Sequence, residues 1–109
     1  MSELNSGALR HRLTLQTPVR TENEGGAAVI TWTNVADVFA GIVPDAGREM
    51  AAADGTTARV THEILIRYRA GVLPAMRLVG EGRVFEIHAV LDVEDRRQWL
   101  KCLCEERLP

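Results

Sequence analysis

The sequence predicts an all-β domain, mainly antiparallel: a small six-stranded barrel or sandwich with a long loop that carries one short helix. Three observations lead to this prediction. Residues 60–69 alternate between apolar and polar side chains, shorter alternating segments lie on both sides, and turn-forming residues separate these segments. No strand–helix–strand crossover is apparent, and closing an antiparallel sheet hides its edges.

The central segment, Val60–Arg69, organises the chain. Its odd and even positions would point to opposite faces of a strand, because strand side chains alternate. One face carries Val60, His62, Ile64, Ile66 and Tyr68, and the other carries Thr61, Glu63, Leu65, Arg67 and Arg69. This pattern is typical of a long, half-buried strand.

The chain begins with a polar segment, residues 1–6, that we interpret as a flexible N-terminal arm. A first strand follows, in which Leu9, His11, Leu13 and Leu15 alternate with polar residues, and it should end at Pro18 because proline lacks a backbone donor. Residues 21–26 then form the expected tip of a hairpin, rich in acids and glycine.

Residues 28–44 predict one long strand with a bulge or break near residues 34–36, where polar residues interrupt the alternation, and an end at Pro44. Trp32 and Phe39 lie in this segment. Because the chain has only five aromatic residues, we expect these two to be buried and to anchor the core.

Residues 45–59 break the β pattern and predict a long connection. Helix formers between Arg48 and Ala53, bracketed by Gly47 and Gly55, favour one or two helical turns within it. Connections of this length in small domains are often functional.

The C-terminal half predicts three further strands. Residues 76–79, 83–91 and 98–106 alternate suitably, with a tight hairpin at residues 80–82 and a charged turn at residues 92–97.

The bulk composition indicates one folded domain over residues 7–109. The net charge of −2 gives the molecule no general attraction for nucleic acid. Cys102 and Cys104 are separated by one residue, which is poor disulfide geometry on a strand, so reduced thiols are expected. With neither a signal peptide nor a membrane-length apolar segment in view, we expect a soluble protein made in a bacterial cytoplasm, without membrane contact.

The sequence offers no catalytic motif, metal site or cofactor site. Phosphate-binding loops, zinc motifs and nucleophile elbows are missing, and His11, His62 and His88 stand apart on separate predicted strands. Catalytic residues, metals and cofactors are therefore expected to be absent. By elimination, the residues alone favour an assembly protein.

Four arginines are candidates for a subunit or partner interface: Arg10, Arg12, Arg67 and Arg69. They project from the polar faces of the first and central strands. If those strands are neighbours, the four guanidinium groups crowd one surface and need acids from another subunit or partner. The alternative is pairing within the chain, to Glu63 or Glu86.

An ordered set of segments carries a family resemblance. GALRHRLTLQ, VITWTNVADVFAGIVP, GRE, THEILIRYR and MRLVGEGRVFEIHAVLDVEDRRQWLKCLCEE follow one another between Gly7 and Glu106. This set resembles the head–tail joining proteins (head–tail adaptor, head-closure or stopper proteins) of tailed bacteriophages, prophages and gene transfer agents. The family usually has tryptophan where this chain has Phe39, a conservative departure.

The resemblance implies a β-barrel that assembles as a homo-oligomeric ring. The ring would lie between the portal and adaptor proteins and the tail, would seal the packaged double-stranded DNA in the head, and would pass it without sequence specificity on ejection. The expected location is the neck of a virion or gene transfer agent. A tail-completion or other neck protein is the main alternative, and a small-barrel nucleic-acid-binding module is a third.

Within such a ring, residues 45–59 would be the gate. Their charges nearly cancel and their middle is small and apolar, so copies from several subunits could meet on the ring axis without gripping DNA. The alternative is that the segment only packs a helical turn on its own barrel. The candidate gating residues are Asp45, Arg48, Glu49, Met50, Ala51, Ala52, Asp54 and Arg59.

Overall fold

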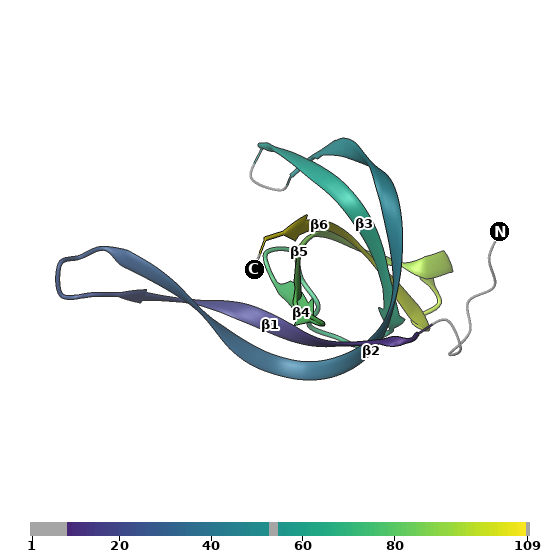
Figure 1. The fold of residues 1–109 in the computed structure, drawn as a ribbon, viewed down its shortest axis with the longest axis horizontal. Helices are drawn as coiled ribbons and strands as arrows, with labels where there is room; N and C mark the ends of the chain where they lie inside the picture. Colours follow the sequence, from purple (N-terminus) through teal and green to yellow (C-terminus); the bar gives the residue numbers. More distant parts are fainter. Residues whose placement is uncertain (1–8, 53–54, 109) are drawn as a thin grey trace.

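A computed structural model describes residues 9–52 and 55–108, so the predicted arm of residues 1–6 lies outside the described part. The fold is a closed antiparallel barrel with a long hairpin projecting from it (Figure 1). Its strands are β1 (His11–Glu22), β2 (Ala28–Ala51), β3 (Thr57–Arg67), β4 (Arg77–Gly80), β5 (Arg83–Asp92) and β6 (Trp99–Arg107). The prediction of six antiparallel strands is confirmed. Of the two predicted architectures, barrel or sandwich, the structure is a barrel.

The barrel closes in the order β1-β2-β3-β6-β5-β4, with β4 returning to pair with β1. This closure needs a glycine. A Cβ atom on Gly80 would lie 2.7 Å from the backbone oxygen of Arg12 and 2.9 Å from Cδ2 of Leu13. Only a residue without a side chain lets β4 approach β1 so closely.

The core is built from the inward faces of the strands, as the alternation predicts. Ile64 and Ile66 of β3 are fully buried, and Phe85 is the large aromatic residue at the centre. The other members of the core cluster are Leu13, Leu15, Ala40, Val72, Met76, Leu78, Ile87, Leu100, Cys102 and Cys104.

The two aromatic residues expected in the core lie elsewhere. Phe39 is 60% exposed, so its prediction as a core anchor is wrong. Val38 and Ala40 take the inward positions of β2, and strand alternation therefore directs Phe39 outward. Trp32 is only half-buried, because it lies in the projecting hairpin beyond the barrel.

The β1–β2 hairpin extends well past the barrel (Figure 1). It makes the molecule elongated, with extents of 52 × 28 × 26 Å. The register shifts between Leu15, which pairs with Ala36, and Gln16, which pairs with Asn34. This leaves Val35 as an extra residue, and the bulge predicted near residues 34–36 is confirmed.

The short helix expected between residues 48 and 53 is replaced by strand. β2 does not end at Pro44 but resumes after a second bulge, and Arg48 to Ala51 pair with Val60 to Thr57 of β3. Gly47 supplies the positive φ of +87° within this bulge. Pairing with the early part of β3 gives the backbone N–H and C=O groups hydrogen-bond partners across the sheet. This gain overrides the weak helix preference of the alanines. In the described residues, the single helical element is a 3₁₀ turn, Val93–Asp95, inside the predicted charged turn.

The tight hairpin between β4 and β5 is confirmed. Glu81 and Gly82, with φ angles of 55° and 74°, form a two-residue loop between Gly80 and Arg83. In the part of the chain that is described, none of the helical segments has the length and apolar character needed to cross a membrane.

Candidate assembly surfaces

The outer half of the β1–β2 hairpin, residues 16–34, is here called the projecting hairpin. Its turn is well organised, because the Asn23 side chain accepts hydrogen bonds from the backbone of Gly25 (3.0 Å) and Ala27 (3.1 Å). Beyond its root, the ribbon exposes apolar side chains: Val19 is 39%, Val29 44% and Ile30 49% exposed. A two-stranded ribbon with both faces in water is marginally stable by itself, and its exposed apolar side chains make this hairpin a candidate contact surface.

The root of the projecting hairpin is fastened to the barrel by polar contacts. Gln16 donates a 2.8 Å hydrogen bond to Asn34 across the hairpin. Its carbonyl oxygen accepts a 2.7 Å hydrogen bond from Nε of Arg77 on β4. The direction of the hairpin relative to the barrel is therefore fixed by named side chains.

The four candidate interface arginines do not form one crowded cluster. β1 and β3 are not neighbours, because β2 lies between them: Ala40 pairs with His11 on one side and Ile66 on the other. Arg12 forms a 2.9 Å ion pair with Asp37 of β2, and Arg10 is exposed. None of the four arginines forms the alternative ion pair with Glu63 or Glu86 in the described residues. Glu63 pairs with Arg48 and Lys101, and Glu86 pairs with Arg107.

Hydrogen bonds also tune the carboxylate at this end of the barrel. Thr14 and then Arg12 donate to Asp37, at 2.8 and 2.9 Å, and these bonds hold the pKa of Asp37 below its usual value. Asp37 is thus ionised at neutral pH and already neutralised by Arg12.

Arg67 and Arg69 lie at the same end of the barrel without a carboxylate partner among the described residues. The guanidinium of Arg67 lies 5.1 Å from the centre of the Trp99 ring. Nε of Arg69 is buried, and among the residues that the structure describes it has no hydrogen-bond partner. A buried donor without a partner costs free energy. Arg69 as a whole is half-buried, so another molecule could reach only the exposed part of its side chain.

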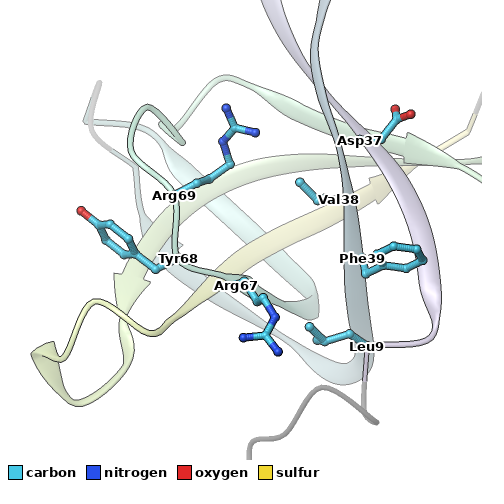
Figure 2. Close-up of a pocket in the computed structure, with 7 residues that line it drawn as sticks. All are labelled: Leu9, Asp37, Val38, Phe39, Arg67, Tyr68 and Arg69. Atoms are coloured by element: carbon cyan, nitrogen blue, oxygen red, sulfur yellow. The ribbon is translucent and has the colours of Figure 1, made fainter.

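These arginines border an open pocket of about 480 Å³ (Figure 2). Figure 2 shows Arg67, Tyr68 and Arg69 on the segment that leaves β3, opposite the part of β2 that carries Val38 and Phe39. The Tyr68 ring points away from β2, and the side chains of Arg67 and Arg69 extend in different directions. The apolar side of the pocket is formed by Leu9, Val38 and Phe39, and Asp37 completes the lining. The pocket therefore combines an exposed aromatic residue with two cations, which suits a ligand with both apolar and acidic groups.

The candidate gate is the paired end of the β2–β3 hairpin. Arg48 bridges Asp45 and Glu63, at 3.4 Å to each carboxylate. The guanidinium of Arg59 packs over Gly47, where a Cβ atom would lie 2.7 Å from Nη2. In the described part of this segment, residues 45–52 and 55–59 thus form a braced hairpin end and not an open loop.

The apolar middle of the candidate gate is partly available for contacts. Met50 and Ala52 are half-buried, and Glu49 and Ala51 are exposed. Asp54 lies outside the described residues. A second pocket, of about 340 Å³, separates this hairpin end from β5 and β6, and its lining includes Ala52, Ala58 and Ile87.

The polar rim of this second pocket is an ion cluster at the ends of β5 and β6. His88 contacts Glu105 at 3.1 Å, and Arg107 contacts Glu86 and Glu105, each at 3.2 Å. The hydrogen bond from Arg107 to Glu86 raises the pKa of Arg107. These contacts join the two strands and need no ligand to neutralise them.

A neighbouring cluster joins β3, β5 and β6. Arg83 donates two hydrogen bonds to Glu106, at 2.9 and 3.0 Å, and a third to Nε2 of His62 at 3.3 Å. The paired hydrogen bonds lower the pKa of Glu106 and raise the pKa of Arg83. The third histidine, His11, contacts Glu81 at 2.9 Å, so each histidine has its own carboxylate neighbour on a different part of the barrel.

The two cysteines are free and buried in the core. Burial raises the pKa of Cys102 to about 12, and it raises the pKa of Cys104 further still. Both thiols are therefore protonated at neutral pH, and they function as small apolar core residues. Within the described ranges, no group of three or more histidine, cysteine, aspartate or glutamate residues is placed to hold a metal ion.

Sequence reasoning missed two features of these surfaces. It ended the first strand at Pro18, whereas β1 continues to Glu22; the exposed β-branched residues on both sides of the turn were the available signal. It also placed Phe39 inside, although Val38 and Ala40 share the parity of the buried positions. A closed barrel with two extended hairpins and an arginine-lined pocket defines a small all-β assembly protein.

The chain belongs to the phage head completion protein family, whose model matches residues 4–107. It is therefore a structural head-completion protein, and the family resemblance stated above is confirmed.

Two solved structures are similar over nearly the whole chain. One is from the virion of a native gene transfer agent particle, at 23% identity and a TM-score of 0.65, covering 100% of both chains. The other is protein SF1141 from Shigella flexneri 2a, at 30% identity and a TM-score of 0.65, covering 94% of this chain and 96% of that one. The first likeness shows a shared fold. A search of curated proteins finds no match to this chain.

Proposed function

We propose that the protein assembles as a ring in the neck of a phage or gene transfer agent particle, between the portal and adaptor proteins and the tail. The observation that carries this proposal is the family match over residues 4–107, together with the elongated shape that the two hairpins give the barrel. In this role the chain, made in the bacterial cytoplasm, seals the DNA-filled head and has no catalytic part.

The paired hairpin end at residues 45–59 is the proposed gate. Copies from several subunits meet on the ring axis through Met50, Ala51 and Ala52, and they part when the tail attaches. The exposed and half-buried apolar groups support this arrangement. The ion pairs of Arg48 with Asp45 and Glu63 support it too, because they brace the base of the hairpin end. Double-stranded DNA then passes without sequence-specific contacts.

Loss of the chain from the particle tests the proposed role. Particles assembled without it should contain heads that lose their DNA and carry no tails, and adding back the purified protein should restore tail attachment. Tailed particles that retain their DNA without the chain would contradict the proposal. Binding of the purified protein to isolated tails, and not to heads, would favour a tail-completion protein instead.

Shortening the hairpin end tests the gate. Arg48 and Val60 pair directly, so a two-residue Asn-Gly turn can replace residues 49–59 and still join paired positions of β2 and β3. We expect the variant to fold and to join the neck, and the filled heads to leak DNA before tails attach. Glu49→Gln is the matched control, because it keeps the length of the hairpin end. Heads that retain DNA as well as the parent would place the gate elsewhere.

A further inference from the structure

We propose that the acidic turn of the projecting hairpin binds in the Arg67–Arg69 pocket of a second copy of the chain, which links neighbouring subunits head to tail. This inference rests on the proposed ring and names the contact that would build it. Two surfaces of the described molecule, the pocket and the acidic turn, each lack an oppositely charged partner.

The first surface is the pocket. It is lined by Arg67, which is exposed, and by Arg69, which is half-buried, and neither arginine has a carboxylate partner among the described residues. The carboxylate at the pocket's other side, Asp37, is already paired with Arg12. Arg67 and Arg69 therefore lack an acidic partner among the described residues, and a carboxylate is the group that best matches a guanidinium.

The second surface is the end of the projecting hairpin. Glu22 and Glu24 are exposed, and in the described ranges neither has an ion pair. Next to them, Val29 and Ile30 are apolar and 44% and 49% exposed. Acidic groups beside β-branched side chains complement a pocket whose lining includes two arginines and the exposed Phe39.

The positions of the two surfaces favour a second copy as the occupant. The pocket lies at the His11 end of β1, since Ala40 pairs with both His11 and Ile66, whereas the turn lies beyond Glu22 at the other end. Eleven residues of strand separate these ends by about 36 Å at 3.3 Å per residue. Figure 1 shows the turn of the hairpin and the start of β1 at opposite ends of the molecule. A contact between different surfaces at opposite ends repeats from copy to copy and closes into a ring when its rotation allows.

Charge exchange tests the contact in assembled particles. Reversing the hairpin acids (Glu22→Arg with Glu24→Arg) or the pocket bases (Arg67→Glu with Arg69→Glu) should lower the yield of tailed particles about tenfold or more, because each subunit contact loses charge-assisted hydrogen bonds. The chain carrying all four substitutions should regain most of the yield. Arg20→Glu is the matched control for a charge reversal on the same hairpin, away from the acidic turn.

Engineered cysteines test proximity directly. Glu24→Cys combined with Tyr68→Cys should give a ladder of oxidised oligomers in purified particles, while each single variant should give none. Val43→Cys with Tyr68→Cys is the control pair, because Val43 is 55% exposed and lies outside both the acidic turn and the candidate gate. The native Cys102 and Cys104 are buried and should not contribute.

The outcomes separate this inference from the proposed function. If wild-type protein is present in particles but charge reversal changes nothing and the Glu24–Tyr68 pair does not link, the inference is overturned and the ring proposal stands. If reversal of the pocket blocks assembly but the fourfold variant does not restore it, the pocket binds another neck protein and the inference is again overturned. Absence of the wild-type chain from particles would contradict the proposed function itself.

Discussion

The guanidinium of Arg77 lies 4.0 Å from the centre of the Trp32 ring, and this contact joins the projecting hairpin to the barrel. Arg77 belongs to β4 and Trp32 to the outer part of β2, opposite Pro18. Because Nε of Arg77 also donates to Gln16, one side chain contacts both strands of the hairpin at its root. Trp32 thus helps to fix the direction of the hairpin and is not part of the core.

Arg77→Ala should loosen the hairpin and leave the barrel folded. The variant loses a cation–π contact, which contributes about 0.5–1 kcal/mol at partly exposed sites, and a charge-assisted hydrogen bond. Amide hydrogen exchange should become faster in residues 17–33 and stay unchanged in β3 and β6. Arg20→Ala, an exposed arginine of the same hairpin, should have no such effect, and unchanged exchange in Arg77→Ala would show that the contact does not hold the hairpin.

Gly80→Ala should destabilise the whole barrel. The added Cβ would meet backbone oxygen of Arg12 at 2.7 Å, and overpacking of this kind costs about 1–3 kcal/mol. Denaturant unfolding measures this loss. Gly25→Ala is the control, since its Cβ would lie 3.5 Å from the nearest atom, Oδ1 of Asn23. Equal stability of the two variants would contradict the proposed need for a glycine where β4 meets β1.

The Arg83–Glu106 pair predicts a specific pH dependence. Because the pKa of Glu106 is lowered in the folded protein, the carboxylate stabilises the fold above its usual pKa of 4.5, and this stabilisation is lost as the pH falls through the lowered pKa. Both side chains are 33% exposed, so Glu106→Gln should cost only about 0.5–1.5 kcal/mol at pH 7.

The difference between Glu106→Gln and the parent should shrink as unfolding is measured at progressively more acidic pH. Glu24→Gln, at an exposed position on the hairpin turn, is the matched control and should change stability little at pH 7 or in acid. A Glu106→Gln penalty that persists unchanged in acid would mean that the stabilisation does not come from the ionised carboxylate.

The buried thiols should resist chemical modification. Since burial raises the pKa of Cys102 to about 12 and that of Cys104 further, almost no thiolate exists at pH 8 in the folded protein. A disulfide reagent for thiols should react with neither cysteine in buffer and with both in denaturant. Rapid reaction of the folded protein would place at least one thiol outside the core.

The sequence predicts the barrel well, because its evidence is local. Alternation placed Ile64 and Ile66 inside, and a polar interruption marked the bulge at Val35. The assembly surfaces were harder, because they depend on where strands pass beyond the barrel. The alanines of residues 51–53 favour a helix in isolation, yet Ala51 pairs with Thr57 across the hairpin. The pocket is still less visible in sequence, since only pairing of β2 with both β1 and β3 brings Phe39 near Arg67 and Arg69.

A reconstruction of the neck of purified particles tests the ring most directly. We expect density for a closed ring of this barrel between head and tail, in which each β1–β2 hairpin reaches the adjacent copy. Particles with attached tails and no density for the barrel between the head and the tail would contradict it.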